Sequence, residues 1–470
     1  MKKFSIIFLV LLACIQVLSA SEAKSDVISP EYTYERLRNA MTGNNPEIRK
    51  AEQVYIQSTL DVKNAKAAYQ PQITSALTAT YMPNPPIGKI SYSVDELSSQ
   101  LGVTIPGAAS GEYLTLYKGM DKTYYNAGIS ITQPVFTWGK IPESVKLYQR
   151  IADIRALDVS DKENKLTAEL KTRLTAMKYM EDVIAKLNDT KALADELVEA
   201  SNDAYQNGML LKQDVTKAKI TAMELDVKEQ EVLKEYRDNL QAIRSLIGDD
   251  ELSAEMISYE INDAEMDAIA AIGHDDLYKL ATRDDSAPLS MLTNQQEALR
   301  LKEKIAKNSL YWKPDLGIQV SLSYGGSAFP LIETNWYRKN DYGIYLTFAV
   351  KATLWDGGKK LNDVKYAASE IKAAEADYDS ALLQLSSAAE ASISQLELSE
   401  AKLEYYELKL EEANDRLSLL ETQKSAGTVS KTDILSQRIE VNTEELSILQ
   451  EKITRSQSIY TLAYLAGIIE

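Results

Sequence analysis

The chain has 470 residues and a formal net charge of −17, because 69 aspartates and glutamates outnumber 52 lysines and arginines. Such an acidic chain is a poor partner for nucleic acid, and its 45% hydrophobic content is typical of a folded protein rather than a disordered tail. One histidine and one cysteine leave too little material for a histidine-ligated metal centre, a serine/histidine triad or a cysteine/histidine pair. We therefore expect no enzyme and no cofactor.

Residues 1–20 have the features of a secretory signal peptide, because two lysines precede an apolar run from Phe4 to Leu18 and small residues follow it. The run is short for a membrane-spanning helix, although an N-terminal anchor is the alternative. The four residues ending at Cys14 resemble a bacterial lipobox, so lipidation of Cys14 and cleavage near Ala20 are both open. No later segment reaches 18 consecutive apolar residues, so we expect an exported protein without a transmembrane helix.

A first structural repeat is predicted at 30–248. Its elements in chain order are a helix from about Pro46 to Tyr69, strands at 72–82 and 124–135, a long helix at 140–207 and a helix at 212–247. The helix boundaries rest on prolines, and the long helix holds no glycine and only one proline, in its first turn. Both strands alternate apolar and polar residues. The loop between them is rich in proline, so we expect it to be irregular and to face outward.

An acidic stretch at 249–285 separates this repeat from the next, with twelve acidic residues and two basic ones. Composition alone favours a solvated linker. His274 lies here between Gly273 and Asp275, and a turn or cap role suits it better than a metal site.

The second repeat, at 286–470, has the same order of elements. They are a helix from about Pro288 to Tyr311, strands at 315–324 and 342–354, a long helix at 359–426 and a helix at 431–467. The segment from Val135 to Lys140 aligns with Leu354 to Lys359 at an offset of 219, and downstream positions keep that offset. Leu403, Tyr406 and Leu410 begin a heptad pattern typical of coiled coils.

The four strands are apolar on one face and polar on the other, which suits either a soluble half-buried sheet or a membrane barrel. Their length of about ten residues, the export signal and aromatic residues at their ends favour the barrel. The aromatic residues are Tyr81, Tyr124, Tyr125, Trp138, Trp336, Tyr337, Tyr342 and Trp355. Strands in lipid cannot leave an edge unpaired, and four strands cannot close. Two copies would supply eight strands around a filled lumen, whereas three would supply twelve with room for a channel.

These features resemble the TolC-like outer membrane efflux proteins over essentially the whole mature chain. The segments that carry the resemblance are Asn45-Pro46, Ala287-Pro288, Gln133 to Phe136, Thr353 to Gly358, Gly208 to Asp214 and Gly427 to Asp433. The resemblance implies a mainly helical homotrimer whose strands form one 12-stranded β-barrel in outer-membrane lipid and whose helices form an α-helical barrel across the periplasm. It implies an exit duct for efflux or type I secretion that docks onto a periplasmic adaptor and an inner-membrane transporter and performs no chemistry.

The resemblance implies that the acidic stretch at 249–285 is an equatorial segment, which contributes to a belt around the middle of the helical barrel. It also implies site residues at the far end of that barrel. The adaptor-contacting tips would be Gly208, Met209, Leu210, Leu211, Gly427, Thr428, Val429 and Ser430. Asp433, with Asp214 at the equivalent turn, would line the channel constriction, although a helix N-cap is the alternative for both aspartates. Ser436 and Val429 replace an acidic residue and an arginine of the family pattern. A non-conducting periplasmic coiled-coil scaffold is the competing function.

Overall fold

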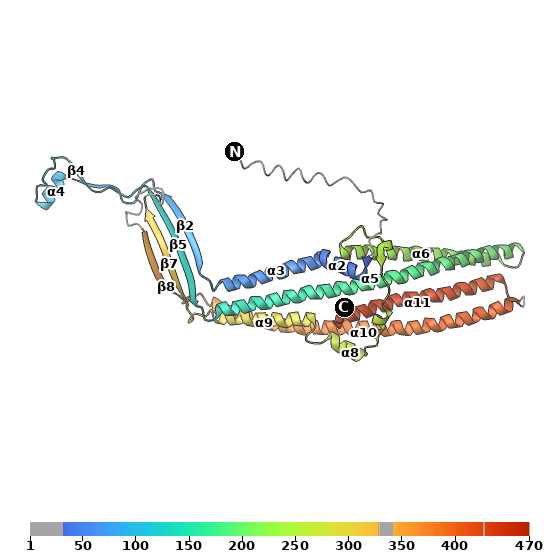
Figure 1. The fold of residues 1–470 in the computed structure, drawn as a ribbon. Helices are drawn as coiled ribbons and strands as arrows, with labels where there is room; N and C mark the ends of the chain where they lie inside the picture. The colour runs from blue at the N-terminus through green and yellow to red at the C-terminus, as the bar shows by residue number, and fades with distance from the viewer. Residues whose placement is uncertain (1–31, 328, 330–341, 426–427, 470) are drawn as a thin grey trace, which may run out of the picture. The chain divides into compact units, whose positions relative to one another are not determined.

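The computed structural model describes residues 32–327, 329, 342–425 and 428–469 (Figure 1). The predicted signal peptide with Cys14, the tip residue Gly427, and Trp336 and Tyr337 lie outside the described residues. The chain forms two compact units, and each is treated by itself. The helical unit comprises the chain up to Arg49, Lys162–Thr282 and Leu385–Glu470, and the sheet unit comprises Lys50–Asp161 and Arg283–Gln384.

The elements follow the predicted order in both halves of the chain. The first half contains β1 (Tyr32–Thr33), α2 (Tyr34–Asn44), α3 (Pro46–Ala67), β2 (Gln72–Tyr81), β3 (Ile90–Ser93), α4 (Val94–Leu101), β4 (Tyr113–Tyr117), β5 (Thr123–Phe136), α5 (Lys140–Gln206) and α6 (Lys212–Ile247). The second half contains η1 (Ala254–Met256), β6 (Ile257–Ser258), α7 (Asp263–Ala270), α8 (His274–Ala281), α9 (Ala287–Lys307), β7 (Asp315–Gly326), β8 (Tyr342–Lys351), α10 (Lys359–Ser425) and α11 (Lys431–Leu465). The mainly helical fold with four long strands is confirmed.

The four long strands form one antiparallel sheet in the order β2-β5-β7-β8. The second strand of the first repeat thus pairs with the first strand of the second repeat. Strand β8 ends at Lys351, three residues before the predicted end, and the segment that follows turns through Gly357 and Gly358, both with positive φ, into α10.

The expectation of an irregular loop between β2 and β5 was wrong. Strands β3 and β4 form an antiparallel hairpin there, and α4 lies between them with Ser93 as its N-cap. The Ser93 Oγ accepts the backbone N–H of Glu96 at 3.1 Å, which is the pairing that favours serine at this position. The prolines that suggested an irregular loop stand outside these elements and leave the ladder intact.

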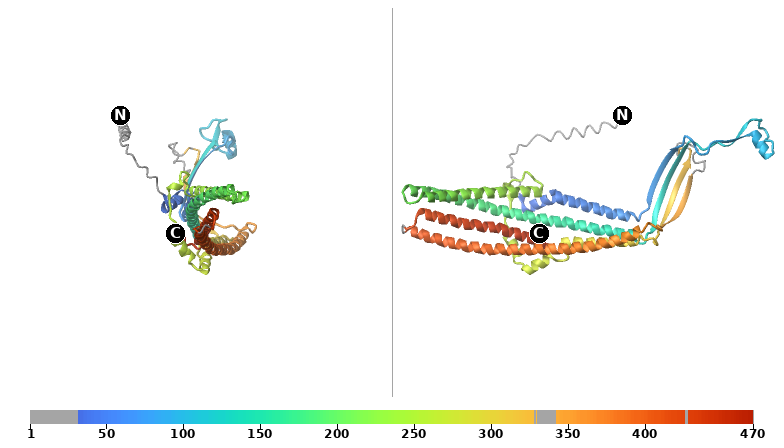
Figure 2. Two further views of the ribbon diagram at one scale, coloured as in Figure 1. Left: turned by 90° about the vertical axis from the view of Figure 1, so that its right-hand side faces the viewer. Right: turned by 180° about the vertical axis from the view of Figure 1, so that it is seen from behind.

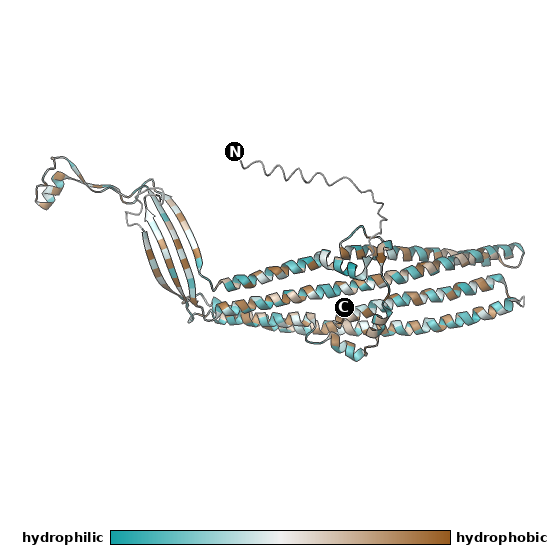
Figure 3. Ribbon diagram, in the orientation of Figure 1, coloured by the Kyte–Doolittle hydropathy of each residue, from teal (hydrophilic) through white to brown (hydrophobic). Residues whose placement is uncertain are grey.

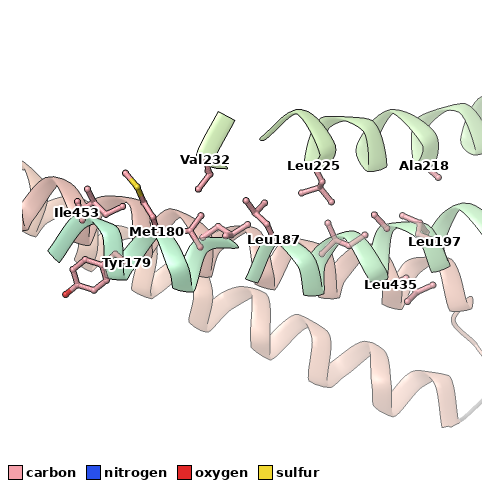
Figure 4. Packing of buried hydrophobic residues seen from close by; sticks show 14 residues of the cluster. Tyr179, Met180, Leu187, Leu197, Ala218, Leu225, Val232, Leu435 and Ile453 are labelled. Carbon is pink, nitrogen blue, oxygen red and sulfur yellow. The ribbon is translucent and has the colours of Figure 1, made fainter. Parts of the chain in front are cut away.

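A heptad seam along α5 forms the centre of the helical unit. Its buried residues step by four and three, and they are Ala176, Met180, Val183, Leu187, Thr190, Ala194 and Leu197. They pack between buried residues of α6 and of α11, as Figure 4 shows for Leu225 and Leu435. Full burial of a leucine such as Leu187 contributes roughly 1.5–3 kcal/mol, so α5 holds both neighbouring helices.

Polar contacts fix the order of the long helices in this unit as α6-α5-α11-α10. Tyr236 of α6 donates to Glu181 of α5 at 3.0 Å, and burial with that carboxylate raises the pKa of Tyr236 to about 12. Lys186 of α5 pairs with Glu445 of α11. Lys409 of α10 pairs with Glu444 of α11 at 3.2 Å. The helices lie side by side as a curved layer when viewed along their length (Figure 2), with α6 and α10 at its margins.

The acidic segment between the repeats is folded, so the linker expectation was wrong. Met266 and Ile269 of α7 and Leu277 of α8 are buried against the apolar side chains of α10 and α11. Its acidic residues lie on the opposite faces of these short helices, which is why composition suggested a linker. His274 begins α8, and its Nδ1 lies 2.7 Å from Glu397 of α10.

Candidate functional site

The register of the sheet places its apolar residues on one face. Ile73, Ile131, Val320 and Leu346 occupy one row across the four strands. The next row consists of Gln72, Thr132, Gln319 and Thr347, which point to the other face because successive side chains in a strand alternate. Figure 3 shows this alternation as bands along the strands. The sheet therefore has one oily and one polar face.

The oily face is open to its surroundings in this chain. Leu346 is 62% exposed, and the neighbouring apolar row of Ile129, Leu322 and Ile344 is exposed as well. On the polar face, Thr74 and Ser130 form a hydrogen bond between their hydroxyls at 3.1 Å. An apolar sheet face of this extent needs a nonpolar partner or solvent.

Both margins of the sheet are also open. Among the described strands, β2 pairs only with β5, and β8 pairs only with β7. Each margin is a strand of ten residues, and every second residue directs its backbone N–H and C=O outward without a ladder partner in the described chain. Such margins pair with further strands, and in a bilayer they must do so.

Aromatic residues mark both ends of the sheet. Tyr81, Tyr125 and Tyr342 lie at the end formed by the last residues of β2 and the first of β5 and β8. At the opposite end, the indole N–H of Trp138 donates to the carbonyl oxygen of Pro314 at 2.8 Å, and its ring contacts Trp312 at 6.0 Å. Trp312 was not among the predicted aromatic residues. The repeat could have revealed it, since Trp312 aligns with Tyr69 two residues before the matched prolines.

The turn between α5 and α6 forms one predicted tip. Gly208 adopts a positive φ of 74°, which a glycine tolerates without strain. Met209 is 76% exposed, and Leu211 is also exposed. In the equivalent turn between α10 and α11, the hydroxyl and the N–H of Thr428 both donate to the carbonyl oxygen of Gln423. Exposed apolar side chains on a tight helical turn are suited to contact another protein.

Asp214 and Asp433 occupy equivalent positions in these turns. Each is the third residue of its helix, so neither is the N-cap residue that the alternative interpretation described. The backbone N–H of Leu211 donates to Asp214 at 3.1 Å, and that of Ser430 donates to Asp433 at 3.3 Å. Ser430 Oγ in turn accepts the N–H of Asp433 at 3.2 Å, which completes a capping box. Both carboxylates therefore stabilise helix starts.

An ion pair ties the start of α11 to α5. Lys431, the first residue of α11, lies 2.7 Å from Glu196 of α5. The hydrogen bond between them raises the pKa of Lys431 and lowers that of Glu196. The described structure thus brings Asp214, Asp433 and the turns before them into one helical unit.

The two margins of the helical layer carry exposed apolar stripes. On α6 the stripe consists of Ile220, Met223 and Val227, which follow one another at heptad spacing. On α10 it consists of Tyr405, Leu408 and Leu419. Both stripes lie near the tip ends of their helices, and neither is covered within the described chain.

Two findings bear on other kinds of site. Within the described ranges, no three histidine, cysteine or acidic side chains converge in a way that would hold a metal ion. Among the residues that the structure describes, none of the helices combines the length and apolar content needed to cross a bilayer.

Comparison with known proteins gives a consistent result. The family model of the outer membrane efflux protein matches residues 37–249 and 290–467, once over each half. The solved outer membrane protein VceC of Vibrio cholerae has 14% identity and a TM-score of 0.69, with 92% of this chain and 96% of that chain covered.

Two further solved structures are outer membrane channels. CmeC of Campylobacter jejuni has 10% identity and a TM-score of 0.67, with 93% of this chain and 86% of that chain covered. The open state of MtrE of Neisseria gonorrhoeae has 11% identity and the same TM-score of 0.67, with 93% and 89% covered. No curated protein sequence matches the chain significantly.

Proposed function

Because the chain belongs to the outer membrane efflux protein family, which places it in the outer membrane, we propose that it is the exit duct of a tripartite efflux or type I secretion system. Three copies form the duct, which passively conducts substrates received from a periplasmic adaptor and an inner-membrane transporter. The strands contact outer-membrane lipid and the helices extend into the periplasm. The family and its solved relatives are channels, so we assign no catalytic role.

The observation that carries this proposal is the two-faced sheet with two open margins. Lipid suits its oily face, water suits its polar face, and pairing of β8 with β2 of the next copy removes the unpaired margins. Three copies of the four-stranded sheet give a 12-stranded barrel, which is wide enough for an aqueous channel, whereas eight strands enclose a filled interior. The homotrimer is therefore preferred to the dimer.

The margins of the helical layer support the same closure. The exposed stripe on α6 meets α10 of the adjacent copy, so that the layer continues into an α-helical barrel. Charges complement the apolar contact. Lys217 and Lys219 flank the α6 stripe, whereas Glu404, Glu407 and Glu411 lie beside the α10 stripe, and all five are exposed.

We assign the remaining parts on the same basis. Residues 1–20 are a signal peptide, 30–248 and 286–470 are the two structural repeats, and 249–285 forms a belt around the helical barrel. The exposed tip residues contact the adaptor, with Met209 and Leu211 as the apolar anchors. Asp433 and Asp214 line the constriction, where crowded carboxylates would attract cations and repel anions. A cap and a constriction are compatible roles, because both hydrogen bonds that Asp433 accepts from Ser430 use the same carboxylate oxygen, Oδ2.

Recording from planar lipid bilayers tests the duct. The detergent-purified chain is expected to insert and to give discrete, cation-preferring conductance steps. A chain that stays soluble without detergent and never inserts would contradict the proposal and support the periplasmic scaffold.

The constriction makes a separate prediction. Asp433→Asn removes the charge but keeps an oxygen that can accept the Ser430 N–H, so it should lower the cation-over-anion permeability ratio while the helix start stays intact. Asp433→Ala should do the same and also cost about 0.5–2 kcal/mol of helix stability. Asp121→Asn, a change of equal charge in the turn before β5, is the control. An unchanged ratio in both Asp433 variants would remove this residue from the constriction.

A further inference from the structure

Lysines gather where the sheet meets the helices, in a chain that is otherwise acidic. We call this region the junction and define it by residues 63–70, 137–146, 304–315 and 351–360. It contains ten lysines and three carboxylates, whereas the whole chain has a net charge of −17. The lysines are Lys63, Lys66, Lys140, Lys146, Lys304, Lys307, Lys313, Lys351, Lys359 and Lys360. Such a local excess of positive charge on an acidic chain suits a surface that binds an anionic partner.

Contacts between the four segments show that they form one region. The side chain of Gln133, four residues before the second segment, donates to the carbonyl oxygen of Tyr69 at 3.0 Å, and Trp138 donates to that of Pro314. Lys140 Nζ donates to Asp315 at 2.6 Å, and Asp315 is opposite Lys351 in the sheet ladder. Tyr311 donates to Asp356, which connects the end of α9 with the start of α10. All of these residues belong to the sheet unit.

The three carboxylates are already engaged. Glu143 is buried and pairs with Lys304 at 2.7 Å and with Lys146 at 3.5 Å. Asp315 pairs with Lys140, and Asp356 accepts the N–H of Gly358 at 3.1 Å besides the Tyr311 hydroxyl. The surplus of positive charge therefore lies on other lysines. Three of these, Lys63, Lys66 and Lys359, are exposed and come from two helices, α3 and α10.

Exposed tryptophans accompany the lysines. Trp312 is 67% exposed and carries Lys313 Nζ above its ring at 4.8 Å, and Trp355 is 79% exposed. Tryptophan favours the boundary between hydrocarbon and water because its ring is apolar and its N–H is polar. Lysine beside such a boundary attracts anionic headgroups. The same end of the sheet thus provides both parts of a headgroup surface.

We propose that the junction binds anionic phospholipid headgroups of the leaflet that faces the helices. The proposal rests on the proposed function, since the oily face of the sheet must lie in a bilayer for the junction to reach the headgroups. The shared chemistry is the phosphate group, and the partner is a membrane lipid rather than free phosphate, because exposed tryptophans, which favour a membrane boundary, accompany the lysines. An acidic protein partner is the competing occupant.

The test measures lipid selectivity by tryptophan quenching. The full chain is reconstituted into vesicles that contain phosphatidylcholine and increasing fractions of phosphatidylglycerol with brominated acyl chains, and the relative affinity is taken from the quenching curve. Three of the four tryptophans of the chain lie in the junction, so the signal is local. The unmodified protein should prefer phosphatidylglycerol, and each lysine that contacts a headgroup should contribute up to about fivefold to this preference.

The test variant combines Lys63→Gln, Lys66→Gln and Lys359→Gln, and it should lose most of this preference. The matched control removes three exposed lysines outside the junction, Lys372, Lys424 and Lys452, and should keep it. Free inorganic phosphate at millimolar concentration should leave the preference unchanged.

The outcomes separate the two proposals. Equal affinity for both lipids in a protein that still conducts in pure phosphatidylcholine would overturn the headgroup site alone. The headgroup site would also be overturned if the control variant lost the preference for phosphatidylglycerol equally, or if free phosphate abolished that preference. A protein that inserts into neither bilayer would overturn the duct and the headgroup site together.

Discussion

Leu346→Arg is expected to destabilise the inserted protein by about 2–4 kcal/mol, because it places a charge on the oily face near the middle of β8, where the bilayer is most apolar. Thr347→Arg changes the next residue of the same strand, but on the polar face, and is expected to be tolerated. Both variants introduce one arginine, and the two positions are adjacent in the strand. The free energy of unfolding in lipid vesicles, measured by urea titration, distinguishes them.

The pair is informative because a soluble sheet would give a different result. If the oily face were covered by protein, Leu346→Arg would still destabilise the chain, but the loss would also occur without lipid. Equal stability of the two variants in vesicles would contradict the assignment of faces. Conductance of the Thr347→Arg channel should shift toward anions, since its added charge lies in the water-filled lumen.

Met223→Glu is expected to break the trimer at the helical layer. Met223 is the middle residue of the exposed α6 stripe, and the adjoining copy brings Glu404, Glu407 and Glu411 to the same contact. A glutamate there would be buried without a partner and repelled by like charge, so the trimer fraction at a given concentration should fall at least about tenfold. Size-exclusion chromatography with light scattering in detergent measures this fraction.

Met223→Lys is the matched variant for this prediction. It also places a charge in the stripe, but one that the α10 glutamates can pair with, so it should weaken the trimer less than Met223→Glu does. If neither Met223→Glu nor Met223→Lys lowers the trimer fraction, the α6 stripe does not contact another copy.

The sequence predicted the parts of the fold that depend on periodicity. A period of two gave the four strands to within a few residues, because each strand lies between two different environments over its whole length. The long helices were equally clear, since sixty-seven residues without an internal break leave no other regular structure. Because the chain contains two repeats, each helix and strand could be predicted from two different segments.

Other parts depended on contacts that no local pattern carries. The helices α7 and α8 have only a turn or two each, and burial of Met266 and Leu277 against α11 decides that they form. The hairpin of β3 and β4 pairs strands of four and five residues, too short for a clear alternation. The parallel pairing of Tyr32 with Ile257 joins residues more than two hundred positions apart.

The candidate site could likewise be predicted only in part from the sequence. Spacing identified Asp214 and Asp433 as equivalent, but only the structure shows that both lie at the third helical position and hold the N–H of the residue before the helix. Trp312 precedes strand β7, so the alternation within the strands does not indicate it. The exposed stripes on α6 and α10 could not be predicted from the sequence, because this would require knowing which helix faces are buried within one chain.

The most direct test of the account is cysteine labelling along β8 in the membrane. Single cysteines replace each residue from Ile344 to Val350 in turn, and Cys14 is the only native cysteine, so each added thiol is compared with the unmodified chain. A water-soluble maleimide should label positions 345, 347 and 349 in lipid vesicles and leave 344, 346, 348 and 350 protected. Labelling that ignores this alternation, or that protects the polar positions instead, would contradict a sheet with lipid on one side and water on the other.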